Sequence, residues 1–598
     1  MIVHPTSFLR HRAAAALLAT FVGLSAGALG CKSPGAPADA GVAGLSPVPA
    51  PAGLVAEAFL PTPDATWAKV RALVGGSAAL LPGSAGALAA SLLGLPIAVA
   101  SEIDGSVPVL GAAVEAPDRP RPRVVIGIHV KDGGRLVDQL TRGEGARFRA
   151  APDAATSIAL LEPLQGTSPA ALGVLGNYLL VAESAGDLTT VGPYVARTMP
   201  QAQAPKEDLA VEIPRPAIEG PVLRAARSAW DQARGPDGAP RPTAVPLAPA
   251  IEGALAMLGD LERARVTLVL DENAHLRVSG TPKAGGGPAS KASTDLAVGD
   301  VKPLLELPAD ALAGIVVRDR AASRAENVPK LVDALAGLVD GGLPPAERER
   351  LGAVIRAASD ARGDWFAGGL RFNEAGPTAF VRAAVGDRAK LETAVQDLLG
   401  MAEIQPVKAA LQREGLRMST GKAELPQLEG EVRRVRFEQT AAAGQPGAGQ
   451  PPARKGPAGP GASADKRGAG APGASQPPPT IELLYIVRDD GLFASVGNDP
   501  SAGLRSVVAA PQGERLGGVP AMNAALAPLG SDIAFAMVVD PLRLVASRLG
   551  QPGAGDPAPV VIAAGAAPAA AGAPAALWAR ADIAAAAIRE LIRLGGAF

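Results

Sequence analysis

The chain has 598 residues, of which 48% are hydrophobic and 19% are charged, a balance typical of a folded globular protein. Lys and Arg total 57 against 58 Asp and Glu, and no long basic stretch is present, which excludes the electrostatic footprint of a nucleic-acid-binding protein. Aromatic residues make up only 3% of the chain, which argues against a platform that stacks bases or sugar rings.

The N-terminus has the pattern of a secretory signal. Arg10 and Arg12 precede an apolar run over residues 13–29 that contains no charged residue. This run of roughly 17 residues, rich in Ala and Gly, is near the lower limit for crossing a bilayer of about 30 Å. We therefore expect the segment to be removed as a signal peptide and not retained as a membrane span.

Two cleavage sites compete after this run. Residues 26–28 (Ala-Gly-Ala) fit the small-x-small rule of ordinary signal peptidase, whereas residues 28–31 (Ala-Leu-Gly-Cys) resemble the lipobox of bacterial lipoproteins, with Ala where Leu is commonest. Cys31 is the only cysteine of the chain and stands where lipoprotein processing needs a thiol. The resemblance implies that residues 1–30 are a signal peptide and that Cys31 carries lipid.

The resemblance to lipoproteins also implies a location. Lys32 and Ser33 follow the cysteine without an Asp retention signal, which in many Gram-negative bacteria means sorting to the outer membrane. We expect a lipid-anchored protein of the bacterial cell envelope that faces the periplasm. Each buried methylene of the lipid adds about 0.8 kcal/mol to anchoring. Residues 31–52 then form the lipidated cysteine and a tether of Pro, Ala and Gly, able to extend roughly 60 to 70 Å.

The body of the chain carries the pattern of a duplication. An apolar strand over residues 124–130 is followed by an amphipathic helix, and the strand over residues 379–385 is followed in the same way. Both junctions contain Asp, two residues, a basic residue and Leu. Asp132 and Asp387 each fall where a helix N-cap is expected, which explains both carboxylates structurally.

Further segments match between the two halves. Residues 55–60 correspond to 313–317, and residues 177–182, with the helix after them, correspond to 491–496. The spacing of this last pair is larger because a low-complexity, Pro- and Gly-rich insertion occupies residues 440–479.

The sequence thus predicts a first copy over residues 53–295 and a second copy over residues 296–598. Turn residues at 271–273, 373–376 and 489–491 predict β-hairpins. The fold class expected is α+β, with two tandem related copies whose largely antiparallel sheets are covered by helices. The copies pack either as a pseudo-symmetric pair or through one continuous sheet.

A short segment resembles a broad group of proteins. Residues 307–312 (Leu-Pro-Ala-Asp-Ala-Leu), followed by a strand and a helix, resemble the opening of uncharacterised secreted bacterial α+β proteins. The resemblance covers about ten residues and implies no role for any of them.

Candidate catalytic and metal-binding residues are few. His129 and His275 are isolated in strand-like segments, which favours structural roles over metal ligation, and processing at Cys31 leaves no free thiol for catalysis. Ser184 follows a strand and precedes a helix, as a nucleophile elbow does, but Ala182 replaces the first Gly of that motif. A serine that caps the helix is the favoured interpretation.

Two other patterns lack the residues that their chemistry needs. Residues 419–422 (Ser-Thr-Gly-Lys) resemble the end of a phosphate loop, but Leu416 and Ala423 occupy positions where the motif requires Gly and Ser or Thr. No paired catalytic carboxylates are signalled, although carboxylates distant in sequence could meet in the fold.

The sequence therefore favours a non-enzymatic envelope lipoprotein. We expect a binding or scaffolding module for an envelope protein, lipid or cell-wall partner, with membrane contact through its lipid, no nucleic-acid partner, no cofactor, no metal, and Cys31 as its one site residue. The alternative is an envelope hydrolase that uses a serine or carboxylates.

Overall fold

A computed structural model describes most of the chain beyond residue 45, including the last residues of the expected tether. It covers residues 46–119, 121–142, 146–153, 155–165, 168–234, 248–337, 339, 342–373, 376–439, 480–548, 556–567 and 575–595. Cys31 and the expected insertion at 440–479 lie outside these residues. The chain divides into two compact units: residues 1–301, 524–545 and 555–598 form the first, and residues 302–523 and 546–554 form the second.

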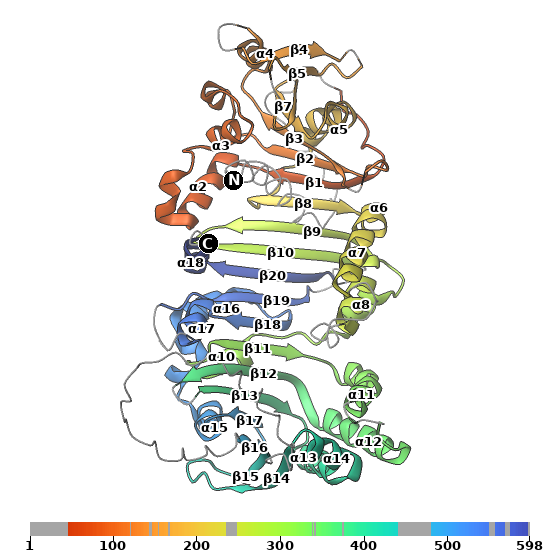
Figure 1. Ribbon diagram of the computed structural model, residues 1–598, viewed down its shortest axis with the longest axis vertical. Coiled ribbons are helices and arrows are strands. Elements are labelled where there is room, and N and C mark those ends of the chain that lie inside the picture. Colours follow the sequence, from red (N-terminus) through yellow and green to blue (C-terminus); the bar gives the residue numbers. More distant parts are fainter. Residues whose placement is uncertain are drawn as a thin grey trace, which may run out of the picture. The chain divides into compact units, whose positions relative to one another are not determined.

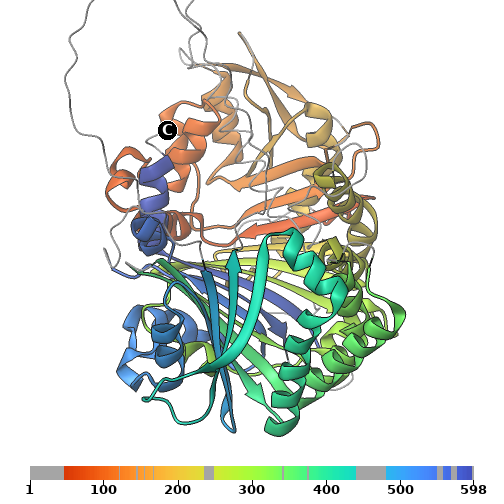
Figure 2. The ribbon, with the colours of Figure 1, turned by 60° about the horizontal axis from the view of Figure 1, so that its bottom comes forward.

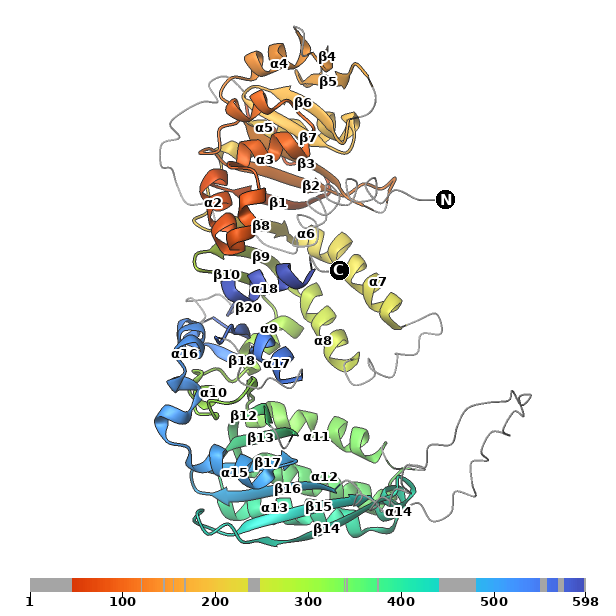
Figure 3. The same ribbon diagram turned by 60° about the vertical axis from the view of Figure 1, so that its left-hand side comes forward.

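The first unit is built on one antiparallel sheet (Figures 1 and 3). Its strands lie in the order β4-β5-β6-β7-β3-β2-β1-β8-β9-β10-β20-β19-β18. Their bounds are β1 Leu54–Leu60, β2 Val109–Val114, β3 Arg123–His129, β4 Phe148–Pro152, β5 Ala159–Pro163, β6 Ala171–Leu175, β7 Tyr178–Ala182, β8 Leu209–Pro214, β9 Leu261–Leu270, β10 Asn273–Pro282, β18 Ile533–Val539, β19 Val560–Ala566 and β20 Leu577–Ala584.

Helices cover this sheet on both faces. They are α2 Pro63–Val74, η1 Gly75–Leu80, α3 Ala85–Leu92, η2 Ile97–Ser101, α4 Gly133–Thr141, α5 Ala185–Arg197, η3 Met199–Gln201, α6 Arg215–Ala217, η4 Ile218–Val222, α7 Leu223–Arg234, α8 Ala248–Gly259, α9 Pro288–Asp295, η9 Ala527–Leu529 and α18 Ala585–Gly595. Helices α16 (Pro520–Leu526) and α17 (Pro541–Arg548) each contain residues of both units.

The strand β7 shows why this sheet needs helices on both faces. All five of its residues are buried. Tyr178 and Leu180 pack with Val191 of α5 on one face, whereas Leu179 and Val181 pack with the residues of α3, η2 and α4 on the other. Successive side chains of a strand point to opposite faces, so a continuous apolar run fits a strand covered on both sides.

Within the second unit the strands pair antiparallel in the order β11-β12-β13-β17-β16-β15-β14. The strands are β11 Ala313–Arg318, β12 Arg362–Asn373, β13 Gly376–Val385, β14 Leu416–Ala423, β15 Val432–Gln439, β16 Thr480–Arg488 and β17 Gly491–Gly497. The helices are α10 Lys302–Leu305, α11 Ala321–Ala336, α12 Pro345–Ala361, α13 Arg388–Gly400, η6 Met401–Glu403, α14 Gln405–Arg413, α15 Pro500–Ala509, η7 Gln512–Glu514 and η8 Leu516–Gly518. Figure 2 shows the green and cyan helices of this unit beside its strands.

The predicted α+β class is confirmed, because helices accompany antiparallel sheets in both units. Both predicted N-caps are confirmed as well: the Asp132 carboxylate accepts from the Arg135 N–H (3.0 Å) and the Asp387 carboxylate from the Lys390 N–H (3.1 Å). Predicted hairpins form between β9 and β10 and between β16 and β17. Among the described residues, no helix has the length and apolar character that a membrane crossing requires.

Candidate ligand-binding site

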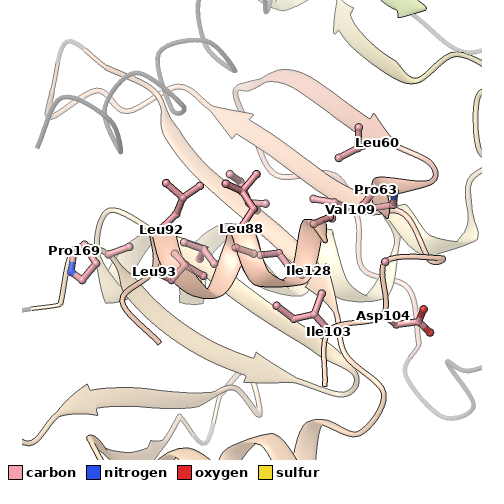
Figure 4. A pocket seen from close by; sticks show the side chains of 16 residues that line it. Leu60, Pro63, Leu88, Leu92, Leu93, Ile103, Asp104, Val109, Ile128 and Pro169 are labelled. Atoms are coloured by element: carbon pink, nitrogen blue, oxygen red, sulfur yellow. The ribbon is translucent and has the colours of Figure 1, made fainter. Parts of the chain in front are cut away.

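An apolar cavity of about 220 Å³ lies in the first unit between α3 and the sheet (Figure 4). Helix α3 and the residue after it supply one wall, made of Ala85, Leu88, Ala89, Leu92 and Leu93. Strands β1, β2, β3 and β7 supply the other wall with Leu60, Val109, Ile126, Ile128 and Val181. Aliphatic side chains therefore face one another across the cavity.

The sequence of α3 explains how this wall is held. The Ser84 hydroxyl caps the helix by accepting from the Ala87 N–H (3.1 Å). Gly86 faces η2 so closely that a Cβ there would lie 2.7 Å from the Ala100 carbonyl oxygen. Leu88 and Leu92, spaced i and i+4, lie on one face of the helix and line the cavity.

One ionisable side chain, Asp104, lines the cavity and lies at one end of the row of apolar side chains in Figure 4. Its Oδ1 accepts from the Ser106 hydroxyl (2.6 Å) and the Ser106 N–H (3.1 Å). The side-chain bond from Ser106 is the main reason why the pKa of Asp104 is lowered, and burial opposes it. The carboxylate is thus charged at neutral pH.

His129 lies next to this acid, with its Nδ1 3.7 Å from Asp104 Oδ2. Its ring meets the Tyr178 ring edge-on at a centroid distance of 5.3 Å. Burial lowers the pKa of His129, and the charge of Asp104 only partly offsets that effect. Burial also raises the pKa of Tyr178 to about 12, so both rings are neutral at pH 7. His129 thus has the structural surroundings that its place in the sequence favoured.

The segment that carries α3 has an unusual composition. No Asp, Glu, Lys or Arg occurs between Arg71 and Glu102, the longest such stretch of the chain. The segment also contains Gly, Pro and Ser, so its apolar residues do not form one continuous run. Leu80 and Ile97, on either side of α3, are 91% and 74% exposed. In the sequence, this run of charge-free, largely apolar residues distinguishes the segment from the rest of the chain.

The second unit also has an apolar cavity, of about 340 Å³, between its helices α11, α12, α13 and α14. Leu335, Leu351, Met401 and Leu411 line it together with the carboxylate-bearing Glu414. The helices around it carry many charged side chains, unlike α3. The two linings are alike in kind, and the cavity under α3 differs in that the helix forming its wall carries no charged side chain.

Ser184 has the capping role that the sequence favoured. Its hydroxyl accepts from the Asp187 N–H (3.2 Å) at the first turn of α5. The neighbouring carboxylates of Glu183 and Asp187 are bound by Arg119, at 3.1 and 2.8 Å. This geometry explains Ser184 without a nucleophilic role.

His275 in β10 has two carboxylate partners. Its Nδ1 lies 2.6 Å from Asp582 and its Nε2 lies 3.1 Å from Asp271. Each carboxylate lies next to a different ring nitrogen of His275, so the two carboxylates are on opposite sides of the ring and do not face a shared binding position. Over the described ranges, no group of three or more His, Cys, Asp or Glu side chains could hold a metal ion.

Residues 419–422 lie within β14 and pair along their length with β15. A phosphate loop needs a turn that leads into a helix, with backbone N–H groups turned toward the anion. An extended, paired strand cannot provide this arrangement, which agrees with the sequence-based rejection of the motif.

The fold brings together two carboxylates that the sequence could not pair. Glu57 of β1 and Glu212 of β8 are direct cross-strand partners. The Tyr194 hydroxyl donates a hydrogen bond to Glu57. Burial raises the pKa of Glu212, although Arg265, 3.6 Å away, partly offsets the shift. Neither glutamate lines the cavity under α3.

No family model, curated protein or solved structure matches this chain. Function must therefore be argued from the chemistry of the sites. The cavity under α3 offers aliphatic contact on two sides and a carboxylate at one end, and its described lining residues include no Ser, Thr, Cys, His or Lys. Such a lining can hold a hydrocarbon group, with about 25 cal/mol gained per Å² of apolar surface removed from water.

Proposed function

We propose that this chain is a lipid-anchored binding protein of the bacterial cell envelope, and that it holds an apolar ligand in the cavity under α3. The observation that carries the proposal is the lining itself: aliphatic side chains of α3 face those of four strands, and Asp104 is the only ionisable member among the described lining residues. A cavity of this kind stays free of ordered water and accepts hydrocarbon groups. This is the binding module expected from the sequence, with a class of ligand added.

The anchor in this proposal rests on the sequence features around Cys31. The described chain begins at Ser46, and Val48 is already held by the body: its N–H donates to the Thr198 hydroxyl (2.9 Å) and its carbonyl accepts from the same group (2.6 Å). The lipid on Cys31 is thus expected to lie a short length of chain away from the first unit.

We also propose that the body arose by duplication. The order of strands in the second unit, β14-β15-β16-β17-β13-β12-β11, repeats the order β4-β5-β6-β7-β3-β2-β1 of the first unit. Equivalent strand-to-helix junctions carry equivalent caps: Asp132 matches Asp387, and Ser184 matches Asp499. Both features support two related copies. The strands β18, β19 and β20 of the predicted second copy belong to the first compact unit.

Binding of an apolar fluorophore tests the function. N-phenyl-1-naphthylamine gains fluorescence when it leaves water, and we expect it to bind the chain from residue 31 onward with Cys31→Ser, which keeps every described residue. Ala89→Phe fills the cavity and should weaken binding at least tenfold. Ser91→Phe adds the same ring to the exposed side of α3 and should change affinity less than twofold. Equal effects of the two substitutions would remove the cavity as the binding site.

A second candidate function has one specific observation in its favour. The carboxyl groups of Glu57 and Glu212 are neighbours in different environments, and the raised pKa of Glu212 is what a general acid needs. This is the carboxylate version of the hydrolase alternative; its serine version loses support because Ser184 caps α5. Hydrolysis of a panel of chromogenic glycosides and esters, abolished by Glu212→Gln and retained by the exposed Glu183→Gln, would favour it over ligand binding.

A further inference from the structure

The segment that carries α3 exposes apolar side chains to a degree that single exposed leucines do not explain. Leu80 and Ile97 are the two most exposed large apolar side chains among the described residues. Both belong to the uncharged segment between Arg71 and Glu102, and α3, which lies between them, forms a wall of the cavity. Isolated exposed apolar residues are ordinary, but strongly exposed apolar residues within one uncharged segment, whose helix lines an apolar cavity, point to an interaction surface.

The segment is held in place, not loosely attached. Trp67 of α2 donates its indole N–H to the Pro82 carbonyl (2.8 Å), two residues after Leu80. At the other end, Val99 of η2 is buried two residues after Ile97. Leu80 and Ile97 are therefore presented by fixed backbone, so that their exposure is a property of the fold.

Basic side chains border this uncharged segment. Arg71 donates to the Gly83 carbonyl (3.4 Å), Arg147 to the Gly94 carbonyl (3.2 Å) and Lys131 to the Ser101 carbonyl (2.7 Å). Acidic side chains lie nearby as well: Asp64 accepts from the Ala85 N–H (2.9 Å), Glu102 pairs with Arg135 (3.0 Å), and Asp104 lines the cavity. Apolar side chains flanked by Lys and Arg suit a membrane interface, where the cations meet lipid phosphates and the apolar groups enter the acyl layer.

The fold does not require this absence of charge. If the two halves are related, α12 is the counterpart of α3, since each is the last α-helix before the second strand of its series. Helix α12 begins Pro-Ala-Glu-Arg-Glu-Arg, whereas α3 reads Ala-Gly-Ala-Leu-Ala-Ala-Ser-Leu. The same place in the topology thus accepts a charged helix, and the apolar sequence of α3 calls for another reason.

The length of chain between Cys31 and the described residues allows the first unit to contact the membrane. About 15 residues separate Cys31 from Ser46, and they can extend to roughly 50 Å. That reach is similar to the diameter of about 50 Å expected for a compact domain of about 300 residues. A lipid on Cys31 therefore allows either face of the first unit to meet the bilayer, and tethering converts this contact into an intramolecular event.

We propose that Leu80, Ile97 and α3 form a surface that inserts into the interfacial layer of a lipid bilayer, and that the cavity beside it accepts one acyl chain of a membrane lipid. The inference rests on the proposed function and names its ligand. The lipid anchor holds the protein near the membrane, and the uncharged segment places the opening of the cavity against the hydrocarbon chains.

Sedimentation with vesicles tests the docking. The chain from residue 31 onward with Cys31→Ser should bind vesicles of phosphatidylcholine with one third phosphatidylglycerol, and Leu80→Asp combined with Ile97→Asp should weaken binding at least tenfold. Ile481→Asp in β16 changes a side chain that is also more than half exposed, and it should change binding less than twofold. Thermal melting checks that the variants remain folded, as is expected for exposed positions.

A tryptophan reporter gives a second measurement. Leu80→Trp should shift its emission to the blue and lose fluorescence when the vesicles carry brominated acyl chains, while Ile481→Trp should show neither change. Vesicle binding that is unaffected by the double Asp variant, or an unquenched tryptophan at position 80, would overturn the inference. So would loss of a dimer in the double variant, because the surface would then contact a second copy of the chain.

The two proposals fail in different ways. Persistent binding of N-phenyl-1-naphthylamine together with absent vesicle binding overturns the membrane inference and leaves the cavity with a free apolar ligand. If N-phenyl-1-naphthylamine does not bind the protein that has no substitution in the cavity, the proposed function is overturned.

Discussion

The Nδ1 atom of His275 lies 2.6 Å from Oδ1 of Asp582, and the two residues face each other across the antiparallel pair of β10 and β20. Arg580 donates to the same carboxylate from its Nε (2.7 Å). Strands β10 and β20 are the last strands of the two predicted copies. Within the first unit they are linked by the buried Asp582, which binds His275 and Arg580.

Removal of this acid should destabilise the first unit. Asp582→Ala deletes the shared acceptor of His275 and Arg580, and we expect a loss of about 2 to 3 kcal/mol in the free energy of unfolding. Urea unfolding followed by circular dichroism measures it. Glu590→Ala on α18 removes an exposed i,i+3 pair with Arg593 and should leave the unfolding midpoint nearly unchanged. Similar losses in the two variants would contradict a structural role for the pair.

The two helix caps should contribute equally. Asp132→Ala and Asp387→Ala each remove one side-chain acceptor from an N-terminal N–H, and each should lower the melting temperature by about 2 to 4 °C. Asp132→Asn and Asp387→Asn retain an acceptor and should cost much less. Thermal melts of the four variants give the values. A large effect at one site and none at the other would argue that the two junctions are not structurally equivalent.

These caps show what local sequence predicts well. An Asp or Ser between a strand and an amphipathic helix is best placed as the N-cap of that helix. The N-cap roles of Asp132, Asp387 and Ser184 were therefore predicted correctly from the sequence. Strand pairing of distant segments is different. Glu57 meets Glu212, and His275 meets Asp582, only because the sheet brings β1 to β8 and β10 to β20. No local pattern encodes those neighbours.

The cavity could not be predicted for a related reason. Its walls come from α3 and from four strands, and an apolar side chain that lines a cavity looks in sequence like one that fills a core. Leu88 and Leu92 have ordinary helical spacing. The missing charges and the apolar content between Arg71 and Glu102 distinguish this segment, but they do not show that it lines a cavity.

His129 should make stability depend on pH. Burial lowers its pKa in the folded chain below the usual value of about 6.5, so below that pH the unfolded chain binds the proton more readily. The stabilisation contributed by neutral His129 is complete above pH 6.5 and is lost as the pH falls through the folded pKa. His129→Phe keeps a ring against Tyr178 and should show a smaller fall in melting temperature between pH 7 and pH 5.

Comparing His129→Phe with the unsubstituted protein isolates the titration of His129, because the carboxylates that titrate between pH 5 and pH 7 are the same in both proteins. His129→Gln, which is also uncharged, should reproduce the smaller pH dependence with a lower overall melting temperature, since the ring contact is lost. Identical pH dependence in all three proteins would show that His129 does not titrate differently on unfolding.

Gly86 should tolerate no side chain, because the backbone of α3 packs directly against η2 at this position. A Cβ at this position would lie 2.7 Å from the Ala100 carbonyl oxygen and 3.3 Å from the Ile103 Cβ. Gly86→Ala must therefore push α3 away from η2, and we expect a loss of about 1 to 3 kcal/mol, as for other overpacked sites. Gly83 lies just before the same helix, and a Cβ there would meet no atom within 4 Å. Gly83→Ala should be neutral or stabilise by a few tenths of a kcal/mol, since alanine restricts the unfolded chain. Equal melting temperatures for the two variants would mean that the packing of α3 on η2 does not hold the cavity wall.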